Sequence, residues 1–478
     1  MSPHPANKKF ENATRRALSV SLLLLVSFVV VGFLAELTGA QGLMRDLIDL
    51  ATNASFLLLC ATSLVLFTIR EWALLAVAFI LSILLVQLPH SGAVFSDALG
   101  LAAFFAVFIA MLTIMKEAAK RSQSVVEVGV YLTSQPPGRR FYSVAFGSHI
   151  LGAFLNFSAV SLIAPLIQKG AQASAGAKNS DLERRQLSAL IRGFSWILLW
   201  APTTLTQAVL LQMFTEINYV LLLGLGFGSA ILMIAVGRIF DRVEWPAPKI
   251  QPNGGQLEPP RQSLRVVFFV CGALLTFTYF GKFLTGFSIA ETLIIVAPLI
   301  TIIWLFAQKS AARRYYGGSH AGESIASILD AAAPDLARSA IVLGLSGFIG
   351  RVSVNIFPTT EIALWLESSN ISGWVFLSIL PIIITLGGQI ALSPIVFVVF
   401  LGGVLTGLPT LPADPTHIVF ALSVGWALSM TASPNATATL LISATCNIAP
   451  TTLTWKWNSR YALVCYLIFS GIFYLIEL

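Results

Sequence analysis

Long apolar runs, separated by short polar segments, recur from one end of the chain to the other. A helix that crosses a membrane needs about 20 consecutive, mainly apolar residues. The pattern therefore predicts about eleven membrane-spanning helices and an all-α polytopic membrane protein. The predicted spans are residues 17–34, 55–69, 73–88, 98–115, 193–214, 217–236, 264–280, 289–307, 340–357, 418–445 and 461–476.

Two further apolar segments, residues 143–168 and 374–405, have unusual flanks. Basic residues lie on both sides of the first, whereas Glu361, Glu367 and Asp414 flank the second without Lys or Arg. Cytoplasmic loops carry an excess of Lys and Arg, so a simple span would place one flank on the wrong side. Both segments are therefore predicted to be re-entrant hairpins, the first opening on the cytoplasm and the second on the outside.

An internal repeat relates the two halves of the chain. Aligning Pro202 with Pro434 also aligns Gly193 with Gly425, and in each half a hairpin precedes the aligned helix. Because the two hairpins open on opposite sides, the halves form an inverted-topology repeat. Such repeats place a solute site near the membrane midplane, between the halves.

The repeat also predicts the domain organisation. Residues 1–54 hold the N-terminal tail and the leading helix, and residues 55–244 form the first repeat. The Pro- and Gly-rich residues 245–263 form a linker, and residues 264–478 form the second repeat.

Interrupted helices supply the candidate chemistry. Proline inside a helix removes a hydrogen bond and frees backbone groups. Half-helix N-termini then suit anions, whereas C-terminal carbonyls suit Na⁺. The predicted solute-binding residues are Asn156, Ser158, Gln389, Ser393, Thr203 and Asn435. The predicted ion-binding residues are Pro202, Thr204, Ser433, Pro434 and Thr437. Arg351, inside a predicted span, is a candidate counter-charge for an anion or for another helix.

Composition supports the membrane assignment and narrows the function. Only 11% of the residues are charged, whereas soluble domains carry about 25%. The net charge of +7 comes from short loops, as in the positive-inside pattern, so nucleic acid is not an expected partner. The chain has no GxSxG, HExxH or P-loop motif, so an enzyme is not expected. We expect neither a cofactor nor a metal centre, with Na⁺ as the candidate coupling ion.

Three segments carry a family resemblance: residues 154–160 with Pro165, residues 200–204, and residues 430–436 with Ser433-Pro434-Asn435. They resemble the ion transporter superfamily, notably the divalent anion:sodium symporters. Members have eleven spans, two opposed hairpins with a Ser-Asn-Thr motif, and a helix broken at Thr-Pro-Pro-Asn after each hairpin. Neither hairpin here has that Ser-Asn-Thr motif, and residues 387–393 differ most. The resemblance implies an elevator-type carrier and leaves the arsenite and sodium/proton members open.

The sequence thus predicts a secondary active transporter of the bacterial inner membrane, which moves a small anionic solute, with sodium favoured over protons. Its expected partners are that anion and the lipid bilayer, and a homodimer is one open oligomeric state. Alternatives remain: the membrane subunit of a binding-protein-dependent transporter, a membrane-embedded enzyme or a lipid-handling protein, and an uncoupled channel.

Overall fold

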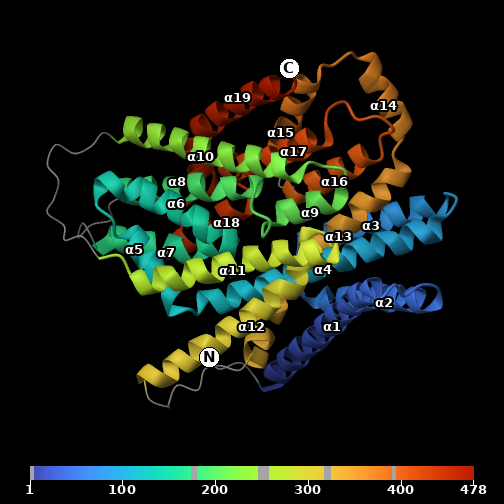
Figure 1. Cartoon of the computed structure of the whole chain (residues 1–478), viewed down its shortest axis with the longest axis horizontal. Coiled ribbons are helices and arrows are strands. Elements are labelled where there is room, and N and C mark those ends of the chain that lie inside the picture. Colours follow the sequence, from blue (N-terminus) through green and yellow to red (C-terminus); the bar gives the residue numbers. More distant parts are fainter. Residues whose placement is uncertain (1–4, 174–179, 246–257, 317–324, 390–393) are drawn as a thin grey trace. The chain divides into compact units, whose positions relative to one another are not determined.

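The computed structural model describes residues 5–173, 180–245, 258–316, 325–389 and 394–478, and within these ranges the secondary structure consists of helices joined by turns, without strands (Figure 1). Ten helices in these ranges are long and apolar enough to cross a membrane. The sequence predicted about eleven spans, and the one that is missing among these ten helices is the run 193–214. There the structure has three short elements in place of one long helix, because the chain opens at Ala201 and Pro202.

Residues cluster into two compact units, each of which draws on both halves of the chain. The first unit comprises Met1–Ala118, Ala273–Thr359 and Val399–Gly407. Its main elements are α1 (Pro5–Leu37), α2 (Leu43–Ser63), η1 (Leu64–Leu66), α3 (Ile69–Val86), α4 (Ser91–Lys120), α12 (Ile289–Tyr316) and α13 (Ile325–Ile356).

The second unit comprises Ala119–Gly272, Thr360–Val398 and Leu408–Leu478. Its main elements are α5 (Gln123–Thr133), α6 (Pro137–Leu155), α7 (Phe157–Ala173), α8 (Ser180–Phe194), η2 (Ser195–Leu199), α9 (Leu205–Met213), α10 (Tyr219–Glu244), α14 (Thr359–Ser368), α15 (Gly373–Gln389), α17 (Pro415–Ala432), α18 (Thr437–Cys446), η3 (Thr452–Lys456) and α19 (Ser459–Ile476). Two helices, α11 (Arg261–Thr285) and α16 (Pro394–Thr406), contribute residues to both units.

Small residues let the helices of the first unit approach closely. A Cβ on Gly344 would lie 2.5 Å from the Phe56 ring, and one on Gly347 would lie 2.5 Å from Phe105. One turn on, a Cβ on Gly350 would lie 2.9 Å from the carbonyl oxygen of Val399. One face of α13 therefore packs tightly, as is common where helices meet in a membrane.

The second unit contains two matching helix pairs, α6 with α8 and α15 with α17. A Cβ on Gly193 of α8 would lie 2.1 Å from the carbonyl oxygen of Ala145 in α6. A Cβ on Gly425 of α17 would lie 2.9 Å from the Cα atom of Pro381 in α15. The two glycines that the sequence aligns therefore make corresponding contacts, one with α6 and one with α15.

Three segments expected to be polar loops form helices instead. These are α5, the basic α8, and α14, which carries Glu361 and Glu367. Each is short, and α8 places apolar residues at helical spacing between its charges, so that Leu187, Leu190 and Ile191 are buried. Most of the predicted linker, residues 246–257, lies outside the described residues.

Candidate functional site

The interruption of the second repeat lies at Ser433–Ala436, between α17 and α18. Ser433 is fully buried, and its hydroxyl donates to the carbonyl oxygen of Gly388 at 2.6 Å. The Asn435 amide Nδ2 donates to the carbonyl oxygens of Gly388 and Gln389, at 3.0 and 3.2 Å. The interruption of α17 is thus tied to the last turn of α15, whose carbonyls would otherwise lack partners.

Gln389, the last residue of α15, bridges two further elements. Its Nε2 donates to the carbonyl oxygen of Ala432 at 3.3 Å, and its Oε1 accepts from Trp455 Nε1 at 2.9 Å. The structure therefore brings Gln389, Ser433 and Asn435 together. Their fellow candidate Ser393 lies outside the described residues.

The interruption of the first repeat lies at Trp200–Thr204, between η2 and α9. The buried Thr203 hydroxyl donates to the carbonyl oxygen of Ala153, near the end of α6. Thr204 begins α9 as its N-cap and donates to the carbonyl oxygen of Ala201 at 2.7 Å. Pro202 is buried between them. Polar residues at the two interruptions thus bind backbone carbonyls near the ends of α6 and α15.

Asn156 joins α6 to α7 in a left-handed conformation with φ of 50°. Asn156 is only 2% exposed, yet neither its amide oxygen nor its amide nitrogen has a hydrogen-bond partner. An unpaired buried polar group costs about 1–3 kcal/mol. Ser158 is buried two residues further, in the first turn of α7. Asn156 is therefore the candidate whose side chain the protein itself leaves unsatisfied.

A direct hydrogen bond connects the first interruption to the helix that carries the second. The buried Gln207 of α9 donates through Nε2 to the carbonyl oxygen of Leu198 at 2.9 Å and to the Ser423 hydroxyl of α17 at 3.2 Å. Past the second interruption, Thr437 begins α18 and is half-buried. The candidates of both repeats thus belong to one packed unit.

Arg351 stands apart from the other candidates, because it belongs to the first unit. Its guanidinium forms an ion pair with Asp97 of α4, and both side chains are about half exposed. Arg351 was predicted to balance the charge of either an anion or another helix, and in the structure its partner is a carboxylate of another helix.

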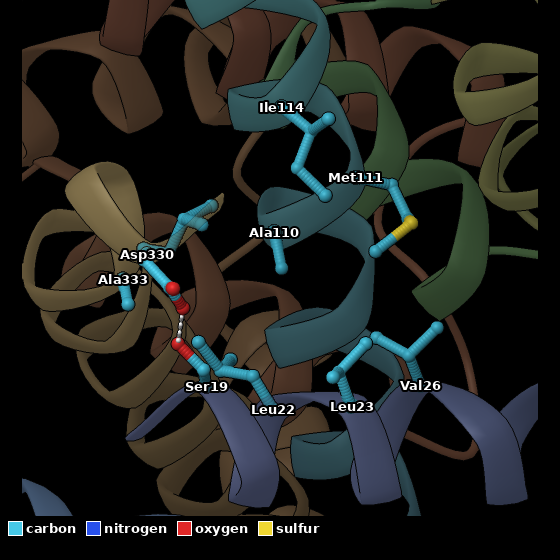
Figure 2. A pocket seen from close by; sticks show the side chains of 10 residues that line it. Ser19, Leu22, Leu23, Val26, Ala110, Met111, Ile114, Asp330 and Ala333 are labelled. Carbon is cyan, nitrogen blue, oxygen red and sulfur yellow. Dashed lines mark hydrogen bonds between the residues drawn. The ribbon is translucent and has the colours of Figure 1, made fainter. Parts of the chain in front are cut away.

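A pocket of about 160 Å³ in the first unit has a different character (Figure 2). It lies between α1, α4 and α13 and is lined mainly by hydrocarbon, with the Ser19 hydroxyl donating to Asp330 at 2.9 Å on one side. An anionic solute would meet apolar side chains and a carboxylate there. We therefore do not assign the solute site to this pocket.

No family model matches the chain, and no curated protein matches it. Solved structures share its fold, among them the following two. The YdaH transporter of Alcanivorax borkumensis matches with a TM-score of 0.57 and 15% identity, over 84% of this chain and 97% of that chain. MtrF of Neisseria gonorrhoeae, described with a class of antimetabolite efflux pumps, matches with a TM-score of 0.55 and 12% identity, over 84% of this chain and 95% of that chain. The chain shares the fold of these two proteins.

Two buried polar residues outside the predicted site contact the first interruption or the helix before it: Arg192 and His149, the latter a candidate in the sequence for either a proton relay or a structural hydrogen bond. Arg192, read as part of a loop, is 1% exposed and donates through Nε to Asn458 Oδ1 at 2.8 Å. His149 of α6 bridges Gly193 and Trp200: its Nδ1 lies 2.9 Å from the carbonyl oxygen of Gly193, and its Nε2 accepts from Trp200 Nε1 at 3.0 Å. Both stabilise the frame around the first interruption. The spacing of the basic residues in α8 fits an amphipathic helix, and this pattern could have predicted a helix there.

The start of α17 is held by a polar cap outside the membrane span. Asp414 Oδ1 accepts from the backbone N–H of Thr416 at 2.7 Å. Burial acts to raise the pKa of the Asp414 carboxyl, but hydrogen bonds from Thr416 and the nearby His417 outweigh burial, so the pKa lies below its usual value. The cap therefore stays ionised and stabilises the positive end of the helix.

Proposed function

We propose that this chain is an elevator-type secondary active transporter that moves a small anionic solute, with sodium as the coupling ion. The observation that carries the proposal is Asn156, a buried amide with two unsatisfied polar atoms at a helix junction. Its Nδ2 suits an anion and its Oδ1 suits a cation, so one side chain offers a ligand to each. Thr203, Asn435 and the other polar residues at the interruptions provide further neutral ligands.

Helix ends supply the charge that the site lacks in its side chains. The N-terminus of α7 begins beside Asn156, and α9 and α18 begin directly after the two interruptions. Such N-termini carry about half a positive charge and favour anions. This arrangement supports binding of an anion without a buried Arg or Lys at the interruptions.

The division into two units supports the elevator mechanism. The second unit holds α6, α7, α15 and both interruptions, whereas the first consists mainly of long uninterrupted helices. We propose that the second unit carries the solute and that the first is the scaffold. The resemblance to the divalent anion:sodium symporters supports the same assignment, which we place in a bacterial cytoplasmic membrane.

Transport by purified protein in proteoliposomes tests the proposal. We expect uptake of a small dicarboxylate or another organic anion that rises several-fold with an inward sodium gradient. Uptake that is unchanged without sodium and collapses with a protonophore would replace sodium with protons. Flux that responds to neither gradient would indicate a channel, and flux that needs a soluble solute-binding protein would indicate a subunit of a larger system. Because MtrF is described with efflux pumps, export should be measured in parallel.

Labelling of introduced cysteines in intact cells tests the inverted topology. In a background without the four native cysteines, we expect a membrane-impermeant maleimide to modify Ser368→Cys and to spare Ser180→Cys. The reason is the charge pattern: acidic flanks surround Ser368, whereas the segment near Ser180 is basic. Modification of Ser180→Cys alone would contradict the predicted orientation of both hairpins.

A further inference from the structure

Two arginines of α8 lie against the ends of two other elements of the second unit. These arginines are Arg184 and Arg192. The residues that they contact, called the wall below, are Glu244 and Trp245 at the end of α10, and Trp457 and Asn458 just before α19. Arg192 donates to Glu244 Oε1 at 3.4 Å and to the carbonyl oxygen of Trp457 at 3.3 Å. Its Nη1 is buried and has no partner.

Arg184 is held by aromatic rings. Its guanidinium carbon lies 5.1 Å from the Trp245 ring centre and 5.7 Å from the Trp457 ring centre. Among the described residues no carboxylate or other acceptor pairs with this guanidinium, and its Nε is buried without a partner. The rings fix the orientation of the guanidinium plane, yet they leave its hydrogen-bonding capacity unused.

The acidic residues nearby do not balance this charge. Asp241, which is almost fully buried, already binds Arg185 at 2.6 Å and also Arg238. Glu244 pairs with Arg192 and offsets one of the two charges, so the cluster of Arg184, Arg192 and Glu244 keeps one positive charge in excess and has unused N–H donors on both arginines.

We propose that Arg184, framed by Trp245 and Trp457 and supported by Arg192, binds the phosphate of an anionic membrane phospholipid. Guanidinium groups bind phosphate oxygens through two parallel hydrogen bonds. Tryptophan is enriched at the level of lipid headgroups, and basic pockets between membrane helices on the cytoplasmic side bind anionic headgroups. Arg242 near the end of α10, and Lys456 and Arg460 around the start of α19, predict by the positive-inside rule that these helix ends lie on that side. This site is separate from the proposed solute site.

Native mass spectrometry of the full-length protein, with defined lipids added, tests this assignment. We expect phosphatidylglycerol to be retained preferentially over phosphatidylcholine. Arg184→Gln should weaken phosphatidylglycerol binding about tenfold or more, as expected for a lost hydrogen bond to a charged group. The matched control is Arg242→Gln, an exposed arginine at the same end of α10, which should weaken binding less than about threefold. Arg184→Lys, which keeps the charge but loses the planar fork, should resemble Arg184→Gln.

Three outcomes would overturn the proposal. Equal losses in the Arg184 and Arg242 variants would show that only general surface charge matters. Equal retention of both lipids by the unmodified protein would show that no anionic headgroup is selected. Displacement of phosphatidylglycerol by millimolar inorganic phosphate would identify a soluble phosphate as the ligand. Thermal unfolding of each variant, measured alongside, must remain close to that of the unmodified protein, and Arg184→Lys provides the test if Arg184→Gln fails to fold.

Discussion

Replacing Asn435 with leucine should abolish transport. Leucine keeps the size of the side chain and removes its polar atoms, so the interruption between α17 and α18 loses both a donor and an acceptor. We expect the initial rate to fall at least about 100-fold, which corresponds to about 2.7 kcal/mol of activation free energy. Proteoliposome uptake, measured with saturating and limiting solute and sodium, provides the value.

Asn435→Leu should also lower the stability of the folded protein. Asn435 donates to Gly388 and Gln389, and Ser433 still donates to Gly388 after the change. The carbonyl of Gln389 alone would lose its Asn435 donor, at a cost of about 1–3 kcal/mol. The folded protein should therefore remain, with a lower unfolding temperature.

Thr439→Val is the matched control for Asn435→Leu. Thr439 is fully buried, and its hydroxyl donates to the carbonyl oxygen of Met430 at 3.2 Å, across the same interruption. Valine has the same shape and removes only that hydrogen bond. We expect Thr439→Val to keep most of the transport rate. Equal loss in the two variants, or normal apparent affinity of Asn435→Leu for solute and ion, would mean that Asn435 only joins helices.

The positions of both interruptions followed from the sequence because each combines a proline with neighbouring polar residues. Pro202 and Pro434 cannot donate a backbone hydrogen bond, which favours an opening there. Proline alone does not decide it, since four described helices continue through an internal proline: Pro165, Pro298, Pro334 and Pro381. The junction within residues 143–168 was harder to locate. It lies at Asn156, whose positive φ of 50° is a backbone conformation that glycine adopts most readily, and the asparagine itself gave no such signal.

The environment of each candidate could not be read from the sequence, because it depends on residues far apart in the chain. Arg192 resembles any basic loop residue until α8 forms and buries it against Asn458. Likewise, Arg351 has no distinguishing neighbour in sequence, and its partner Asp97 comes from another helix. The unsatisfied amide of Asn156 is also a property of the packed unit.

Of three glycine-to-alanine substitutions, at Gly193, Gly425 and Gly228, the one at Gly193 should lower the stability of the folded protein the most. In Gly193→Ala the new Cβ would lie 2.1 Å from the carbonyl oxygen and 2.6 Å from the Cα atom of Ala145. Both atoms belong to the backbone of α6, so α6 and α8 must move apart, which also strains the bond from His149 to the Gly193 carbonyl. We expect the free energy of unfolding to fall by about 3 kcal/mol.

Two further substitutions complete the experiment: one at Gly425, which the sequence aligns with Gly193, and one at Gly228, which has free space around it. Gly425→Ala would place its Cβ 2.9 Å from the Cα atom of Pro381 and 2.7 Å from Ile384 Cδ1, so we expect a smaller loss of about 1–2 kcal/mol, because the Ile384 side chain can rotate. Gly228→Ala, in α10, meets nothing within 4 Å and should be neutral or stabilise the helix by up to about 1 kcal/mol. Thermal unfolding in detergent, followed by a thiol-reactive dye that reports exposure of the buried cysteines, gives the three values. If Gly193→Ala unfolds at the same temperature as Gly228→Ala, α6 and α8 do not approach as closely as the aligned glycines indicate, and the correspondence between the two halves loses its structural basis.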